Sequence, residues 1–153
     1  MVTSAPKLDE ATLKQRIQTS PKDTANYFML ARLYEDAGDM ARALATLETA
    51  VKAAPQEANV YLQLAGFHNR RGDFDKTMDA LTRRTGIEPG NPEAYHTMAA
   101  YYWEKAYRDT ALSDAEKRDY IGRGLQAADQ AIALNPDYFE ALTYKNLLLR
   151  SQA

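Results

Sequence analysis

The feature that most constrains this sequence is an internal repeat with a period of about 34 residues. A period of about 20 to 50 residues is typical of proteins in which each repeat packs only on its neighbours. A shift by one period aligns Tyr27, Tyr61 and Tyr95, and it also aligns Ala31, Ala65 and Ala99. Pro21, Pro55 and Pro89 keep the same spacing, but Pro136 follows only after a further 47 residues. The third repeat therefore contains 13 additional residues.

Each repeat is predicted to contain two helices, which a glycine separates in the first two repeats. Four residues of the first repeat recur at the three and four spacing of one helix face, namely Tyr27, Leu30, Ala31 and Tyr34. A second apolar series follows Gly38, and Gly72 occupies the equivalent position one repeat later. Glycine suits a helix end that reverses the chain, because it adopts positive φ without steric cost. The prolines then end the second helix of each repeat.

This pattern of large, small and proline positions resembles the tetratricopeptide repeat family, whose 34-residue unit is a helix-turn-helix. The resemblance implies a single domain over residues 1–153, with repeats at 24–57 and 58–91 and an expanded third repeat at 92–138. Residues 1–23 are predicted to form a tail and a half-repeat helix that carries Leu13 and Ile17, and residues 139–153 a capping helix. The implied fold is all-α, a right-handed α-solenoid of stacked antiparallel helix pairs with about eight helices.

The additional residues of the third repeat lie between Trp103 and Leu125. Ser113 followed by Glu116 has the spacing of a capping box, which predicts that the second helix runs from about Asp114 to Leu134. Both helices of this pair should then extend about one to two turns beyond their neighbours. Either the extension is a family-typical lengthening without a partner, or it forms a secondary interface. The candidate residues for that interface are Tyr107, Leu112, Tyr120, Leu147 and Leu148.

Arg84 occupies a slot that Ala50 and Ala131 fill in the other repeats. We expect its guanidinium to reach the edge of the fold or to pair with a nearby carboxylate. Gly86 follows closely, and glycine disfavours helix by about 1 kcal/mol relative to alanine. These two residues predict that the second helix of the second repeat frays or ends early.

The sequence predicts no catalytic residue, cofactor or metal site. It contains no cysteine and only two histidines, His68 in an aromatic packing slot and His96 on the inner face. Gly122, Gly124 and Ala127 have the spacing of a dinucleotide-binding fingerprint, but no strand precedes them, so we interpret Gly124 as a packing residue. Serine-nucleophile, phosphate-loop and kinase motifs are also missing. The chain is therefore predicted not to be an enzyme.

The composition limits the kinds of partner that the chain is expected to bind. With 19 basic and 21 acidic side chains, the net charge is −2, which gives no general attraction to nucleic acid. No apolar stretch approaches the length of about 18 residues that direct membrane insertion requires, and Met1–Lys7 lacks the apolar core of a signal peptide. We expect a cytoplasmic protein by default, with a periplasmic or exported one left open. The hydrophobic content of 45% is enough for one ordinary folded domain.

In tetratricopeptide repeat proteins the first helix of each pair lines a concave groove that holds peptides. The resemblance places the following residues in that groove: Phe28, Arg32, Glu35, Leu62, Gly66, Asn69, Arg70, His96, Ala100 and Trp103. Trp103 is the only tryptophan, so it is either an anchor for a partner or packed beneath the extended third pair. Phe28 and Leu62 stand where relatives that bind chaperone tails need polar groups, so such tails are not predicted partners.

Two functions from different classes fit these observations. The first is a non-catalytic interaction module or scaffold that binds another protein or an extended peptide in the groove. The alternative is a homo-oligomer that forms rings or filaments, or an accessory subunit of a larger complex. In that case the terminal helices and the additional residues of the third repeat would be the contact surfaces.

Overall fold

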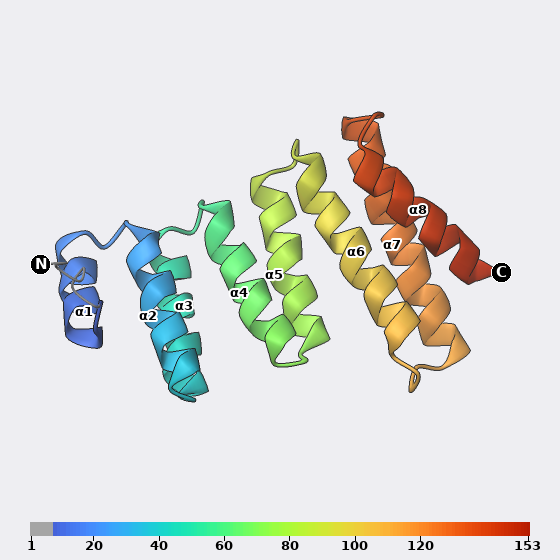
Figure 1. Ribbon diagram of the computed structural model, residues 1–153. Coiled ribbons are helices and arrows are strands. Elements are labelled where there is room, and N and C mark those ends of the chain that lie inside the picture. Colours follow the sequence, from blue (N-terminus) through green and yellow to red (C-terminus); the bar gives the residue numbers. More distant parts are fainter. Residues whose placement is uncertain (1–7) are drawn as a thin grey trace, which may run out of the picture. The chain divides into compact units, whose positions relative to one another are not determined.

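The computed structural model describes residues 8–153, which form eight helices and no strand (Figure 1). The helices are α1 (Glu10–Thr19), α2 (Thr24–Asp36), α3 (Met40–Ala53), α4 (Ala58–Arg70), α5 (Phe74–Ile87), α6 (Pro92–Arg108), α7 (Asp114–Leu134) and α8 (Phe139–Gln152). The prediction of an all-helical chain with about eight helices is confirmed.

The chain divides into two compact units with the boundary inside α5. The N-terminal unit is Met1–Ala80 and the C-terminal unit is Leu81–Ala153. In the N-terminal unit α2 packs against α1 and α3, and α3 also contacts α4. In the C-terminal unit α6, α7 and α8 all pack against one another. Within each unit, successive helices of a pair run antiparallel (Figure 1).

Short polar side chains and glycines set the helix ends. The side chain of Asp39 accepts a hydrogen bond from the Arg42 backbone amide, and Asn91 accepts one from the Glu93 amide. These caps satisfy amides that have no partner inside the helix. Gly38 and Gly72 have φ of 79° and 73°, which confirms the prediction of positive φ at both turns. The period of the sequence is thus visible in the backbone.

The repeated tyrosines and prolines are joined by hydrogen bonds. The hydroxyl of Tyr27 donates to the Pro21 carbonyl oxygen at 2.9 Å, and the Tyr61 hydroxyl donates to the Pro55 carbonyl at 2.9 Å. The same bond recurs between Tyr95 and Pro89 at 3.3 Å. Proline cannot donate from its backbone but still accepts, so each tyrosine ties the segment before its helix to the helix itself. This bond explains why both residue types share one period.

Small residues form much of the core of each unit. In the N-terminal unit Ala43 and Ala50 are fully buried, and in the C-terminal unit Ala99, Ala128 and Ala131 are fully buried. At Gly124 on α7 the neighbouring helices leave even less room. A Cβ added there would lie 2.9 Å from Leu148 Cδ2 and 3.1 Å from Tyr102 Cβ. Gly124 is therefore a packing residue, as predicted. Close helix approach leaves room for little more than hydrogen or a methyl group at these positions.

The helices of the third pair are longer than those before them. Helices α6 and α7 have 17 and 21 residues, whereas α4 and α5 have 13 and 14. The start of α7 is fixed by a capping box in which the Glu116 amide donates to Ser113 Oγ at 3.2 Å and the Ser113 amide donates to Glu116 Oε2 at 2.8 Å. The predicted bounds of α7 agree with the structure.

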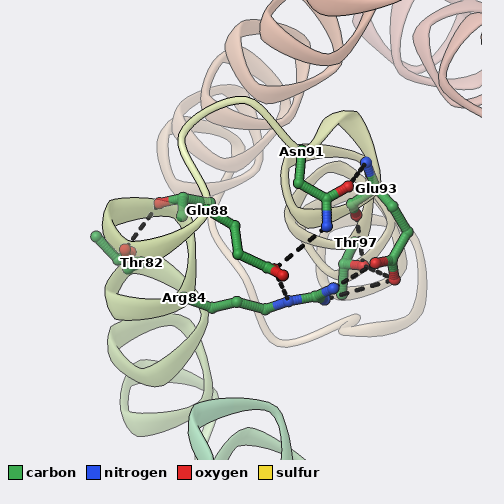
Figure 2. Close-up of polar contacts among 7 residues, drawn as sticks. Thr82, Arg84, Glu88, Asn91, Glu93 and Thr97 are labelled. Atoms are coloured by element: carbon green, nitrogen blue, oxygen red, sulfur yellow. Dashed lines mark hydrogen bonds and ion pairs between the residues drawn. The ribbon is translucent and has the colours of Figure 1, made fainter. Parts of the chain in front are cut away.

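Arg84 lies at the centre of a polar network that joins the end of α5 to the start of α6. Figure 2 shows its guanidinium between Glu88 and Glu93, and it forms ion pairs with both carboxylates. The Arg84 Nε to Glu88 Oε2 distance is 3.1 Å. Asn91 Nδ2 donates to the same Glu88 oxygen at 3.2 Å, and Asn91 Oδ1 accepts from the Glu93 amide at 3.0 Å. The predicted pairing of Arg84 with a carboxylate is confirmed.

The network also corrects one prediction. Burial alone would lower the pKa of the Arg84 guanidinium, but the hydrogen bond and ion pair with Glu93 raise it above its usual value. The charge is thus stabilised although only 7% of the side chain is exposed. Helix α5 continues to Ile87, and its length of 14 residues equals that of α3. The prediction that α5 ends early is therefore wrong. The ion pairs outweigh the low helix propensity of Gly86.

We predict that Arg84→Ala lowers the free energy of unfolding by about 2–4 kcal/mol, because it removes a buried ionic group together with its packed stem. Arg84→Met should cost less than half as much, since it keeps the stem and leaves only solvated carboxylates unpaired. Denaturant titration followed by circular dichroism measures both values. Equal losses for the two variants would contradict a role for the stem.

Candidate functional site

Phe28 and Leu62 form the apolar part of the predicted groove in the N-terminal unit. They lie on α2 and α4, the first helices of two successive pairs, and both side chains are half-buried. Phe28 packs against the core cluster that contains Leu30, Tyr34 and Leu47. Its ring therefore has a fixed position while part of it remains accessible to a partner.

The charged part of this face is organised by one ion pair between the two helices. Arg70 on α4 donates from Nε to Glu35 Oε2 at 3.0 Å and from Nη2 to Glu35 Oε1 at 2.8 Å. The Glu35 side chain is only 12% exposed, whereas that of Arg70 is 46% exposed. Such a two-point pair fixes the plane of the guanidinium as well as its charge. Arg70 and Glu35 are thus already engaged with each other.

Gly66 gives room to this ion pair. A Cβ added at Gly66 would lie 3.2 Å from Nη1 of Arg70, so the guanidinium lies directly over the glycine. From the sequence, a glycine at this place in a helix is explained either by close approach of a ligand backbone or by chance. In the structure the neighbouring group is a side chain of the same helix.

Two further residues of the N-terminal unit that were predicted to lie in the groove remain solvated. Arg32 forms an exposed ion pair with Asp36, with 3.3 Å between Nε and Oδ1, and Asn69 is exposed. An exposed pair of this kind contributes at most about 1 kcal/mol to stability. Arg32 can therefore exchange its carboxylate for one on a partner at little cost.

In the C-terminal unit two of the predicted groove residues, His96 and Trp103, belong to an aromatic cluster, which we define as His96, Trp103, Tyr107, Tyr138 and Tyr144. The rings of Trp103 and Tyr107 are stacked at 5.1 Å between centroids, and Trp103 meets Tyr144 edge-on at 5.7 Å. His96 meets Tyr138 at 5.4 Å and Tyr144 at 5.2 Å, again edge-on. Ala100 is half-buried on the same helix. The cluster brings residues of α6 together with residues at the start and middle of α8.

Of the two alternatives for Trp103, the structure supports packing within the third pair, and a role as an anchor for a partner stays a prediction. Trp103 packs beside Ile121 and Leu148 of the core, yet it remains half-buried and keeps an accessible surface. The structure brings His96 and Trp103 together through Tyr144, and it brings Glu35, Gly66 and Arg70 together in the N-terminal unit.

Burial lowers the pKa of His96, while Glu140 and Glu93 act in the opposite direction. Its Nδ1 atom is buried and has no hydrogen-bond partner within residues 8–153. Burial also lowers the pKa of His68, whose ring meets Phe67 edge-on at 5.5 Å. Burial therefore favours the neutral form of both imidazoles in the folded chain.

We predict that the free energy of unfolding decreases as the pH falls below about 6.5, because the unfolded state then binds protons that the folded histidines resist. His96→Phe should remove part of this decrease, and the remainder should come from His68. Denaturant titrations between about pH 5 and 8 measure the effect, in a range above the titration of carboxylates. If the free energy of unfolding depends on pH in the same way in His96→Phe and in the unaltered chain, the prediction is contradicted.

The predicted secondary interface is only partly at the surface. Tyr107 is 69% exposed, Leu112 and Leu147 are half-buried, and Tyr120 stacks on Tyr102. Leu148 is fully buried in the core of the C-terminal unit and offers no surface to a partner. The exposed leucine of this run is its neighbour Leu149, because the phase of α8 turns that side chain outward.

Sequence reasoning missed Tyr138 and Tyr144 as members of the aromatic cluster. It also missed two cations, Lys117 and Arg150, that lie with Trp103 and Tyr107 around a pocket of the C-terminal unit. The only available signal was the richness of aromatic residues in α6 and α8. It does not indicate which rings meet.

The chain is similar to one sequence family and to several solved structures. The sequence model of the tetratricopeptide repeat matches residues 28–92. Residues 28–92 are thus identified as tetratricopeptide repeats. No curated protein sequence matches the chain. Such repeats are protein-interaction modules, so the fold supports a scaffold role in general terms.

The structural likeness covers nearly the whole chain. The crystal structure of MamA protein has a TM-score of 0.65 and 17% identity over 93% of this chain and 70% of that one. MamA 41-end from Desulfovibrio magneticus RS-1 has a TM-score of 0.62 and 14% identity, covering 93% and 73%. The human IFIT1 dimer with PPP-AAAA has a TM-score of 0.61 and 18% identity over 93% of this chain but 32% of its own. At these identities the likeness establishes the shared repeat fold.

None of the helices within residues 8–153 has the length and apolar character needed to cross a membrane. Within the same residues, no three acidic or histidine side chains converge in a way that could hold a metal ion.

Proposed function

We propose that this chain is a non-catalytic interaction module that binds another protein or an extended peptide through the first helices of its pairs. The contacts come from Phe28, Arg32, Leu62 and Asn69 in the N-terminal unit, and from the aromatic cluster in the C-terminal unit. The repeat family supports this role, and no group of residues that the sequence singled out suggests chemistry on a substrate. A partner that contacts either set of residues would bring apolar side chains together with carboxylates and backbone amides.

The observation that carries the proposal is the mixture of fixed and exchangeable groups on these helices. Phe28 and Trp103 are half-buried, so their rings are held by the core while part of each surface stays accessible. Arg32 is exposed and only weakly paired. Preorganised aromatic groups next to labile charges favour binding, because little side-chain entropy is lost when the partner arrives.

We predict that Trp103→Ala weakens capture of a verified partner by about 2 kcal/mol or more, and Arg32→Ala by about 1 kcal/mol. Isothermal titration calorimetry with the purified partner measures both. Lys52→Ala, an exposed change on the second helix of a pair, is the matched control and should have no effect. Circular dichroism confirms that each variant is folded. If neither Trp103 nor Arg32 matters, the proposed face does not bind the partner.

A second function, self-assembly, is favoured by the outer face of α8, which we define as Phe139, Leu142 and Leu149. These side chains are 74%, 38% and 44% exposed. Leu149 lies 47 residues after Tyr102, the distance that also separates Pro136 from Pro89. Tyr102 stacks on Tyr120 of α7 at 6.1 Å. Leu149 therefore occupies on α8 the position that Tyr102 occupies on α6. On α6 this position faces the paired helix α7, so the outer face of α8 would suit a helix from a second copy.

If this face mediates assembly, light scattering should give a mass above 17.2 kDa that rises with concentration. The double change Phe139→Glu and Leu149→Glu should then return the mass to that of the monomer, because buried carboxylates oppose the contact. Met29→Glu, on an exposed apolar residue of α2, is the control and should leave the mass unchanged. A monomer at every concentration would eliminate self-assembly and leave the interaction module.

A further inference from the structure

An open pocket of about 460 Å³ lies between α6, α7 and α8 in the C-terminal unit. Its walls are apolar and aromatic. They are formed by Trp103, Ala106, Tyr107, Ile121 and Leu147. The volume lies in the range of about 300–1,000 Å³ that is usual for ligand sites, and it is enough for one or two apolar side chains.

The wall of the pocket is preformed. Tyr107 is 69% exposed, yet its ring is stacked on Trp103 with an interplanar angle of 12°. Trp103 is in turn held by Tyr144 and by the core around Ile121. The exposed tyrosine therefore has a fixed orientation and needs little ordering when a ligand binds.

Two cations line the same pocket. Lys117 comes from α7 and is half-buried, and Arg150 comes from the last turn of α8 and is exposed. Neither forms an ion pair within residues 8–153, whereas Lys105, Arg108 and Arg123 of the same unit do. Lys117 acts electrostatically on Asp109, but that carboxylate already accepts from Lys105 Nζ at 2.7 Å. The pocket thus presents apolar walls with unneutralised positive charge.

From this arrangement we infer that the pocket binds a short acidic and apolar segment of a partner protein. An aromatic or aliphatic side chain enters between Tyr107, Ile121 and Leu147, and an adjacent Asp or Glu carboxylate lies against Lys117 and Arg150. The charge complementarity selects the occupant, because a purely apolar segment would leave the cations unpaired and a basic one would be repelled. This inference rests on the proposed function as an interaction module and adds the chemistry of the partner.

The inference can be tested with a phage-displayed library of random peptides selected against the full chain. Selected peptides are synthesised and titrated while the fluorescence of Trp103 is recorded, since this is the only tryptophan in the chain. We expect the selected peptides to carry Asp or Glu next to an aromatic or aliphatic residue. Tyr107→Ala and Arg150→Glu change exposed side chains and should keep the fold, and each should weaken binding by about tenfold.

The controls separate this pocket from the rest of the surface. Arg118→Glu changes an exposed cation next to Lys117 that does not line the pocket, and it should leave the dissociation constant within about twofold. A peptide with Lys in place of its acidic residue should bind Arg150→Glu more tightly than it binds the unaltered chain. Recovery of binding by this charge exchange would not follow from a general loss of structure.

Three results would overturn the inference. One is the absence of any selected peptide. Another is a set of peptides whose binding is unchanged in Tyr107→Ala and Arg150→Glu. If Arg32→Ala weakens the binding of these peptides instead, the pocket is excluded while the proposed function stands. The third is a change of mass with Arg150→Glu in light scattering, which would show that a second copy occupies the pocket. The proposed function is decided separately, by the verified partner.

Discussion

Close approach of helices at small residues is the constraint on which the rest of this structure depends. Where Ala43 and Ala50, or Ala99 and Ala131, are fully buried, neighbouring helices are held at a short distance by backbone and methyl contacts. Dispersion contacts between closely packed atoms are individually weak but numerous. Larger buried side chains, such as Leu47 and Leu148, pack at the margins of these contacts and complete the core. The tyrosines at those margins use their hydroxyl groups to hold the segments that precede their helices.

The two units present different surfaces on the first helices of their pairs. In the N-terminal unit, the Glu35 and Arg70 ion pair joins α2 to α4 and leaves Phe28, Leu62 and Arg32 as the groups available to a partner. The C-terminal unit instead has stacked rings and a pocket with unpaired cations. A partner could thus be recognised by two kinds of chemistry on one chain. This division follows from residues outside the repeat pattern, which the packing of the helices leaves free to vary.

Much of the fold could be predicted because it depends on spacing. The internal period predicted the helices and the two glycine turns, and the Ser113 and Glu116 spacing located the start of α7. Arg84 shows where this reasoning fails. Local propensity argued for an early helix end, but the outcome depended on Glu93, whose position is set by the intervening turn.

The candidate site was less predictable, because it depends on helix phase and on which rings meet. Three consecutive leucines, residues 147–149, could not be divided into buried and exposed members without the phase of α8. The contact of Tyr144 with both His96 and Trp103 required the packing of α8 on α6. Gly66 was singled out for the approach of a ligand backbone, whereas in the structure the group next to it is the guanidinium of Arg70.

The lengthened pair of α6 and α7 also has a consequence for how the chain folds. Its two helices have 17 and 21 residues and are joined by a short connection, so most of their contacts form between residues that are near in sequence. Closing such a hairpin costs little chain entropy, and contacts of this kind are associated with fast folding. The capping box at Ser113 favours helix at the same turn. We therefore expect this hairpin to be a nucleus on which the remaining helices of the C-terminal unit condense.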